Sequence, residues 1–199
     1  MSRATDITGT ALNTIGKVAP QLAACAAFYM FCRTFYRAKV YDSEQLVHQS
    51  AQVDCVRLRQ GFVTTYRWGT GERPVLLLHG WRSRASRFSA LIPGLVALGL
   101  SPVAFDAPGH GDSEGTGATL TDYCDVIDHL QLRYGKFHTI IGHSFGVLSA
   151  FTSLGGSATA DRLVAIAGVS NFQFLVDGML TSTIPSSARP RSWSGNAWR

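Results

Sequence analysis

The chain has 199 residues, of which 46% are hydrophobic and 16% are charged. Soluble domains carry about 25% charged residues on average, so this composition excludes an intrinsically disordered chain and predicts one domain with its own core. The net charge of +5 is not gathered into a basic stripe with interleaved aromatic residues, which argues against nucleic-acid binding. The four cysteines lack metal-ligand spacing, so we expect no metal site, no disulfide framework and a cytoplasmic location.

Residues 1–50 are predicted to form a helical lead-in, because Leu12, Ile15, Val18 and Leu22 recur at near-helical spacing. The apolar stretch Val18–Cys32 is shorter than the roughly 20 residues that a spanning helix needs. No cleavage site of small residues follows it. We therefore favour an amphipathic helix, with a membrane-associated or exported segment at residues 18–32 as the alternative.

Strand patterns begin near Cys55, where Val56 and Leu58 alternate with charged residues. Pro74–Leu78 is a continuous apolar run, as is typical of a strand covered on both faces in a parallel sheet. Further strands are predicted at Gly61–Trp68, Pro102–Phe105, Phe137–Ile141 and Leu163–Ala167, the last of them also buried.

Segments with apolar residues at helical spacing separate these strands and predict helices. The first covers Phe88–Val96, the second covers Thr121–Tyr134, and a third, after Gly146, ends at about Leu154. This alternation predicts an α/β fold with a mostly parallel sheet flanked by helices. After about Thr183 the sequence has no helical or strand periodicity. We therefore expect a helical lead-in over 1–50, an incomplete α/β domain over 51–183 and an irregular tail over 184–199.

The pattern G-x-S-x-G occurs at Gly142–Gly146, between a predicted buried strand and a predicted helix. This context is the one in which the motif forms a nucleophile elbow, with the serine on a sharp strand-to-helix turn. The glycines Gly142 and Gly146 let flanking backbone pass closely. We expect Ser144 to be the nucleophile, the Phe145 amide to be an oxyanion donor, and His143 to be a supporting neighbour.

A second signal, His79-Gly80-Trp81, closes the earlier buried strand. A loop amide at this place can face the elbow and complete an oxyanion hole. We expect the Trp81 amide to be that donor, Gly80 to allow the close approach, and His79 to brace the loop by hydrogen bonds.

Three segments together make the chain resemble the α/β-hydrolase superfamily, in its esterase/lipase and serine-peptidase-like branch. They are LLLHGW at Leu76–Trp81, FDAPGHGDS at Phe105–Ser113 and IGHSFG at Ile141–Gly146. The resemblance covers roughly Phe62 to Ala167. It implies a nucleophilic Ser144, oxyanion donors at Trp81 and Phe145, and a structural loop at Asp106–Ser113.

The chain departs from the family in its acid and base. A serine nucleophile needs an imidazole held by a carboxylate, and in this fold both follow the serine along the chain. Here all six histidines precede Ser144, and the only later acids are Asp161 and Asp177. His129 and His138 are expected to be structural, which leaves the loop residues His79 and His110 as candidate bases.

The sequence therefore predicts a serine hydrolase acting on small-molecule acyl esters, weak or inactive as this chain, without cofactor or metal. Its six predicted strands match the first part of a hydrolase whose last strands are missing. We favour a premature stop or a frameshifted tail as the explanation, and a genuine compact variant is the alternative. The alternative is a non-catalytic hydrolase remnant or an acyl-ligand binding module.

Overall fold

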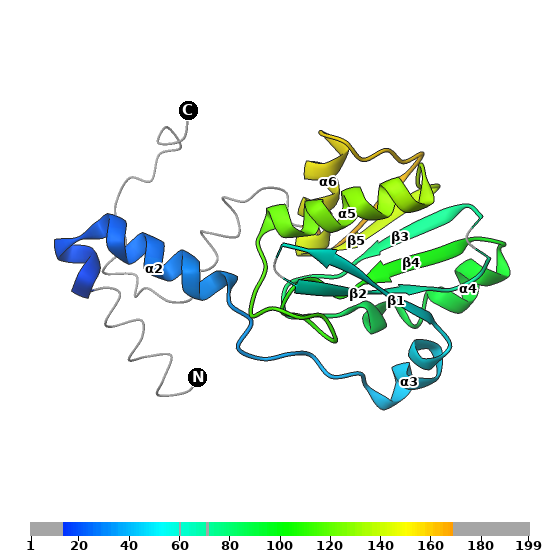
Figure 1. The fold of residues 1–199 in the computed structure, drawn as a ribbon, viewed down its shortest axis with the longest axis horizontal. Helices are drawn as coiled ribbons and strands as arrows, with labels where there is room; N and C mark the ends of the chain where they lie inside the picture. The colour runs from blue at the N-terminus through cyan, green and yellow to red at the C-terminus, as the bar shows by residue number, and fades with distance from the viewer. Residues whose placement is uncertain (1–13, 60, 71, 169–199) are drawn as a thin grey trace. The chain divides into compact units, whose positions relative to one another are not determined.

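The computed structural model describes residues 14–59, 61–70 and 72–168, and these contain a six-stranded sheet (Figure 1). In chain order the strands are β1 (Gln52–Leu58), β2 (Gly61–Arg67), β3 (Pro74–Leu78), β4 (Ser101–Phe105), β5 (Thr139–His143) and β6 (Leu163–Ile166). Their order in the sheet is β1-β2-β4-β3-β5-β6. The strands β4, β3, β5 and β6 run parallel, whereas β2 is antiparallel to both β1 and β4. The predicted α/β class is confirmed.

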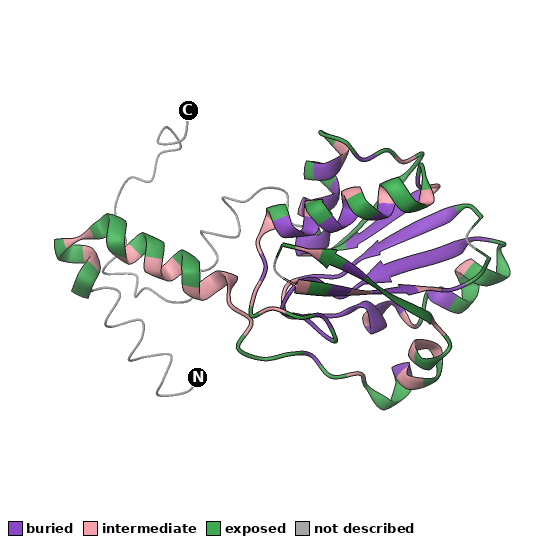
Figure 2. Cartoon of the chain, viewed as in Figure 1, coloured by how far each residue is buried: buried purple, intermediate pink, exposed green. Residues whose placement is uncertain are grey.

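Helices cover both faces of this sheet, α5 and α6 on one face and α4 on the other (Figure 1). The helices are α2 (Pro20–Cys32), α3 (Asp42–Gln49), the short 3₁₀ helix η1 (Ala85–Phe88), α4 (Ile92–Ala97), α5 (Leu120–Tyr134) and α6 (Phe145–Leu154). Every residue of β3 and β4 is buried (Figure 2). The continuous apolar runs in the sequence arise from this two-sided cover.

The core beneath α4 is built from alternating strand residues. Val75 and Leu77 of β3 pack there with Phe88 of η1 and Ile92 of α4. The helix α5 contributes fully buried side chains of its own, including Tyr123. The parallel strands between these layers all end at one edge of the sheet, which is where the site lies.

The chain divides into two compact units. Phe31–Ser170 form one unit, which holds the whole sheet, whereas α2 up to Met30 belongs to the other. The domain boundaries predicted at residues 50 and 183 stay predictions, and the predicted tail 184–199 lies outside the described residues.

Two elements differ from the sequence prediction. The helix expected over 88–96 is instead η1 followed by α4, because Pro93 lacks an amide hydrogen and is tolerated only in the first turn of a helix. The last strand was expected to be buried, but in β6 Val164 and Ile166 remain 44% and 38% exposed. Among the described residues, β6 has β5 as its only neighbour in the sheet.

The helix α6 lies so close to the sheet that two positions require glycine. A Cβ built on Gly146 would overlap the carbonyl oxygen of Leu78 in β3. A Cβ built on Gly142 would lie 2.8 Å from the amide nitrogen of Val147. The two glycines of the G-x-S-x-G motif therefore set the distance between α6 and the strands.

We expect Gly146→Ala to lower the free energy of unfolding by about 3 kcal/mol, because the added methyl group meets backbone that has no room to move. The matched control is Gly94→Ala in α4, where nothing lies within 4 Å of the added Cβ. The control should be neutral or slightly stabilising, because alanine favours a helix more than glycine does. Urea unfolding of both variants measures the difference, and equal stabilities would contradict the close contact.

Candidate functional site

Ser144 sits on a sharp turn between β5 and α6. Its backbone has φ 52° and ψ −116°, a conformation that residues other than glycine rarely adopt. The Ser144 amide donates to the carbonyl of Ile166 in β6 (3.0 Å), which extends the strand pairing up to the turn. The side chain is half-buried, and its hydroxyl forms no hydrogen bond with a described residue. Ser144 therefore lies on a strained turn between a strand and a helix.

The loop after β3 lies directly against this turn. A Cβ built on Gly80 would lie 3.1 Å from the Cβ of Ser144. Next to Gly80, the Trp81 amide donates to no described residue, and neither does the amide of Phe145 at the start of α6. The amides of Trp81 and Phe145 thus belong to the loop after β3 and to the start of α6, the two segments that meet at the turn.

Aromatic side chains hold Trp81 beside the elbow. Its ring meets the ring of Phe145 edge-on at 5.5 Å between centroids, and that of His110 at 5.0 Å. Phe31 stacks on the indole at 5.1 Å with an angle of 16° between the planes. Tyr123 of α5 packs against Phe145 from the core side at 5.2 Å. These contacts fix the peptide that carries the Trp81 amide.

His79 braces the loops and is not free to act as a base. Its Nε2 accepts the amide of Ala107 after β4 (3.0 Å), and its Nδ1 donates to the carbonyl of Gly80 (2.7 Å). The ring is 1% exposed, and this burial lowers its pKa below the ordinary value. The neutral imidazole therefore ties the loop after β3 to the loop after β4, the bracing role that the sequence suggests.

His110, the other candidate base, is also occupied. Its Nε2 accepts the amide of Arg82 (3.1 Å), and its Nδ1 donates to the carbonyl of Pro108 (3.0 Å). Arg82 follows Trp81 directly and has φ 54°, so this hydrogen bond holds a turn in the left-handed region. Burial lowers the pKa of His110 to about 3.

None of the other four histidines lies in the loops after β3 and β4: His48 belongs to α3, His129 to α5 and His143 to the end of β5, and His138 precedes β5. His138 precedes β5, at the opposite edge of the sheet, and its Nε2 accepts from Arg162 (2.9 Å) and Arg73 (3.1 Å). His129 is exposed on α5. His143, next to Ser144, is exposed, and its ring forms no hydrogen bond with a described residue.

Of the two acids that follow Ser144, only Asp161 is among the described residues, and it lies away from the turn. Asp161 precedes β6, at the edge opposite the elbow, and pairs with Lys136 at 2.5 Å. The hydrogen bond from Lys136 lowers the pKa of the Asp161 carboxyl. Asp177 lies outside the described residues.

Asp106, a fully buried carboxylate at the end of β4, organises the loops behind the site. It accepts hydrogen bonds from the hydroxyl of Tyr66 (2.9 Å), from Arg84 Nη2 (3.2 Å), and from the amides of Ala85 (2.7 Å) and Asp112 (2.9 Å). Burial, followed by the charge of Asp106, raises the pKa of Tyr66.

Sequence reasoning missed Arg84 as the partner of this carboxylate. Arg84 is 4% exposed and also pairs with Asp112 at 2.6 Å. A buried aspartate after an apolar strand signals that a cation must lie nearby. Three arginines, at positions 82, 84 and 87, follow β3, and local periodicity does not say which of them turns inward.

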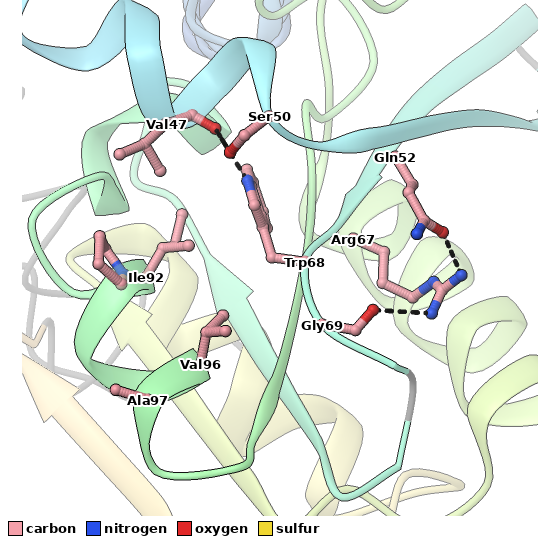
Figure 3. Close-up of a pocket in the computed structure, with 10 residues that line it drawn as sticks. Val47, Ser50, Gln52, Arg67, Trp68, Gly69, Ile92, Val96 and Ala97 are labelled. Atoms are coloured by element: carbon pink, nitrogen blue, oxygen red, sulfur yellow. Dashed lines mark hydrogen bonds between the residues drawn. The ribbon is translucent and has the colours of Figure 1, made fainter.

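A cavity of about 470 Å³ lies at the other end of the sheet (Figure 3). Its lining includes Trp68, Ile92 and Val96. The amide of Trp68 donates to Pro102 at the start of β4 (3.0 Å). The parallel strands begin at this edge and end at the elbow, so the cavity is separate from the candidate site.

No cluster of three or more histidine, cysteine, aspartate or glutamate side chains able to hold a metal ion occurs within the described ranges. The groups that meet at the turn are the Ser144 hydroxyl and the backbone of the loop after β3.

Residues 75–199, more than half of the chain, match the alpha/beta hydrolase family. The chain belongs to this family. A serine hydrolase-like protein of Homo sapiens is 38% identical over 93 residues, which are 43% of this hydrolase chain and 45% of the human protein.

Other similar proteins include esterases and lipases. A pimeloyl-(acyl-carrier protein) methyl ester esterase of Sodalis glossinidius is 34% identical over 84 residues, which are 42% of this chain and 32% of the esterase. The solved structure of a monoacylglycerol lipase of Paleococcus ferrophilus has a TM-score of 0.51 at 26% identity, and covers 59% of this chain and 50% of the lipase. This hydrolase chain spans less than half the length of the curated relatives that it matches.

We expect His110 to make this hydrolase less stable in acid. Its pKa falls from 6.5 in the unfolded chain to about 3 in the fold. Between these values the unfolded imidazole takes up a proton and the folded one does not, so the free energy of unfolding drops as the pH falls. The contribution is at most about 1.4 kcal/mol per pH unit.

His110→Gln keeps an acceptor and a donor but removes the titration, so its stability should fall less steeply with decreasing pH. Urea unfolding between about pH 7 and pH 5 measures this slope. His129→Gln, which removes an exposed imidazole from α5, is the matched control. Equal slopes for wild type and His110→Gln would show that His110 is protonated in the folded chain.

Proposed function

We propose that this chain is a serine hydrolase that cleaves ester bonds through Ser144. The observation that carries the proposal is the backbone of Ser144, which holds its hydroxyl on a turn beside the unpaired amides of Trp81 and Phe145. The start of α6 adds the positive end of a helix dipole at the same place. We assign Ser144 as the nucleophile and the two amides as the oxyanion hole, with Gly80, Gly142 and Gly146 allowing the close backbone approach.

The reaction follows from these groups. The Ser144 oxygen forms a bond to the ester carbonyl carbon while its proton passes to solvent water, and the electrons of the carbonyl double bond move onto the carbonyl oxygen, which becomes negative. The two amides stabilise that oxyanion, an effect worth about 3 kcal/mol per donor. The carbonyl double bond then re-forms as the carbon–oxygen bond of the leaving group breaks, and the departing alkoxide takes up a proton from water. Water attacks the acyl-enzyme and releases the acid and the free serine.

Removal of the proton from the Ser144 hydroxyl is the step for which we identify no general base among the described residues. His79 and His110 are fixed by hydrogen bonds at both ring nitrogens and are kept neutral by burial. An enzyme without its base keeps only the residual catalysis supplied by the oxyanion hole and binding. We therefore expect slow turnover, and the alternative is a module that binds an acyl ligand without cleaving it.

Small-molecule acyl esters are the substrates that we infer. The methyl ester esterase and the monoacylglycerol lipase named above both act on such bonds, according to their names. We expect the working location to be a reducing compartment such as the cytoplasm, because the described cysteines Cys25, Cys32, Cys55 and Cys124 are all free.

We expect the chain to hydrolyse p-nitrophenyl butyrate slowly and to be labelled by a fluorophosphonate probe at Ser144. Ser144→Ala should remove both signals, because the hydroxyl that we assign as the nucleophile is lost. Absorbance at the nitrophenolate band and mass spectrometry of the labelled peptide provide the measurements.

The matched control is Ser157→Ala, which removes an exposed hydroxyl after α6. It should react like the wild type. Labelling that persists in Ser144→Ala would disprove the assignment of the nucleophile. A wild-type chain that neither turns over the ester nor takes up the probe would leave the binding module as the better description.

A further inference from the structure

Residues 31–41, which we call the strap, begin at the end of α2, lead to α3 and belong to the same compact unit as the sheet. The sequence predicts a helical lead-in here, with a membrane-associated segment at residues 18–32 as the alternative. Within residues 14–59, 61–70 and 72–168 no helix is long and apolar enough to cross a membrane. The strap contacts the loops of the candidate site.

Backbone hydrogen bonds join the strap to the segment between β4 and α5. The amide of Ala118 donates to the carbonyl of Cys32 (3.0 Å). The amide of Thr34 donates to the carbonyl of Thr116 (2.9 Å). A Cβ built on Gly117, between these two partners, would overlap the carbonyl oxygen of Cys32. The backbones therefore approach so closely that position 117 requires glycine.

Two side chains of the strap hold the loop after β4 from the same direction along the chain. The Thr34 hydroxyl donates to the carbonyl of Gly109 (2.6 Å). The Arg37 guanidinium donates to the carbonyl of Gly111 (3.1 Å). These two glycines flank His110 in the sequence. The strap is thus fixed to the backbone on both sides of that imidazole.

Phe31, the first residue of the strap, stacks on the indole of Trp81 with 5.1 Å between ring centroids and 16° between the planes. His110 and Phe145 meet the same indole at steep angles, 74° and 60°. The indole Nε1 is buried and has no hydrogen-bond partner among the described residues. Ring packing rather than hydrogen bonding of the indole therefore holds the Trp81 side chain, and Phe31 supplies its stacked contact.

We propose that Phe31 is a positioning residue of the oxyanion hole, held in place by the rest of the strap. It touches no reacting atom and acts through Trp81, whose amide must stay beside Ser144 when the oxyanion forms. This inference rests on the proposed function, in which the Trp81 amide is one of the two donors. An oxyanion exists only after the serine attacks, so a displaced donor lowers kcat and leaves substrate binding unchanged.

Kinetics of p-nitrophenyl butyrate hydrolysis tests the proposal. Phe31→Ala should lower kcat by about tenfold and leave KM within about twofold, because the donor is displaced and not removed. Phe31→Tyr keeps a ring that can stack and should retain the wild-type kcat. The matched control is Phe35→Ala, which removes a ring that is 72% exposed from the same strap. It should react like the wild type.

Hydrogen exchange supplies a measurement that needs no turnover. The Arg82 amide, which follows Trp81, donates to His110 Nε2 (3.1 Å), so its exchange is slow while the loop is held. Phe31→Ala should speed exchange of this amide by about fivefold relative to Phe35→Ala, because a loosened indole lets the loop open. Mass spectrometry of the peptide that contains Arg82 measures the difference.

The two measurements distinguish failure of this proposal from failure of the proposed hydrolysis. The positioning role is overturned if Phe31→Ala equals Phe35→Ala in exchange at Arg82, whether or not the wild type turns over the ester. It is also overturned if an active chain keeps its kcat in Phe31→Ala, or if only KM changes. Faster exchange in Phe31→Ala of a chain without turnover supports the positioning of Trp81 and contradicts the hydrolysis alone. Phe31→Leu replaces Phe31→Ala in both comparisons if circular dichroism shows the alanine variant to be unfolded.

Discussion

The candidate site depends on one buried charge, the carboxylate of Asp106. A carboxylate without contact with water is stable only when hydrogen-bond donors surround it. Its donors come from Tyr66 on β2, from Arg84 and Ala85 after β3, and from Asp112 in its own loop. The loops after β3 and β4 must therefore converge on Asp106, and this convergence keeps Gly80 and Trp81 beside Ser144. Removing one of these donors would leave the buried carboxylate partly unpaired, so the two loops depend on each other for their stability.

The strands and the elbow could be predicted because they depend on local pattern. A continuous apolar run such as Pro74–Leu78 indicates two-sided burial, and the structure places β3 at those same residues. The turn at Ser144 could be predicted because a glycine on each side of a serine, between strand and helix, has a steric cause. Parallel strands then bring the loops at their carboxyl ends to one edge of the sheet, which places Trp81 near the elbow.

Other features depend on contacts between distant residues, which local pattern does not contain. The exposure of β6 depends on how many strands flank it, and the pairing of Arg84 with Asp106 joins different loops. The histidines were ambiguous for the same reason. A residue type alone does not tell whether an imidazole such as His110 is a free base or a fixed acceptor. In the structure the Nε2 of His110 accepts a hydrogen bond from the amide of Arg82, and this contact shows that the imidazole is a fixed acceptor.

The backbone at Ser144 has a cost that the rest of the fold must offset. Residues other than glycine in sparsely populated backbone conformations lower the free energy of unfolding by about 1–3 kcal/mol each. Ser144, with φ 52° and ψ −116°, has such a conformation. Glycine would adopt the same angles with little penalty, so selection for thermal robustness alone would favour its replacement of this serine. Serine at position 144 therefore lowers the stability of the fold in exchange for an accessible hydroxyl. In a homologue that no longer needs this hydroxyl, glycine at the same position would be the more stable choice.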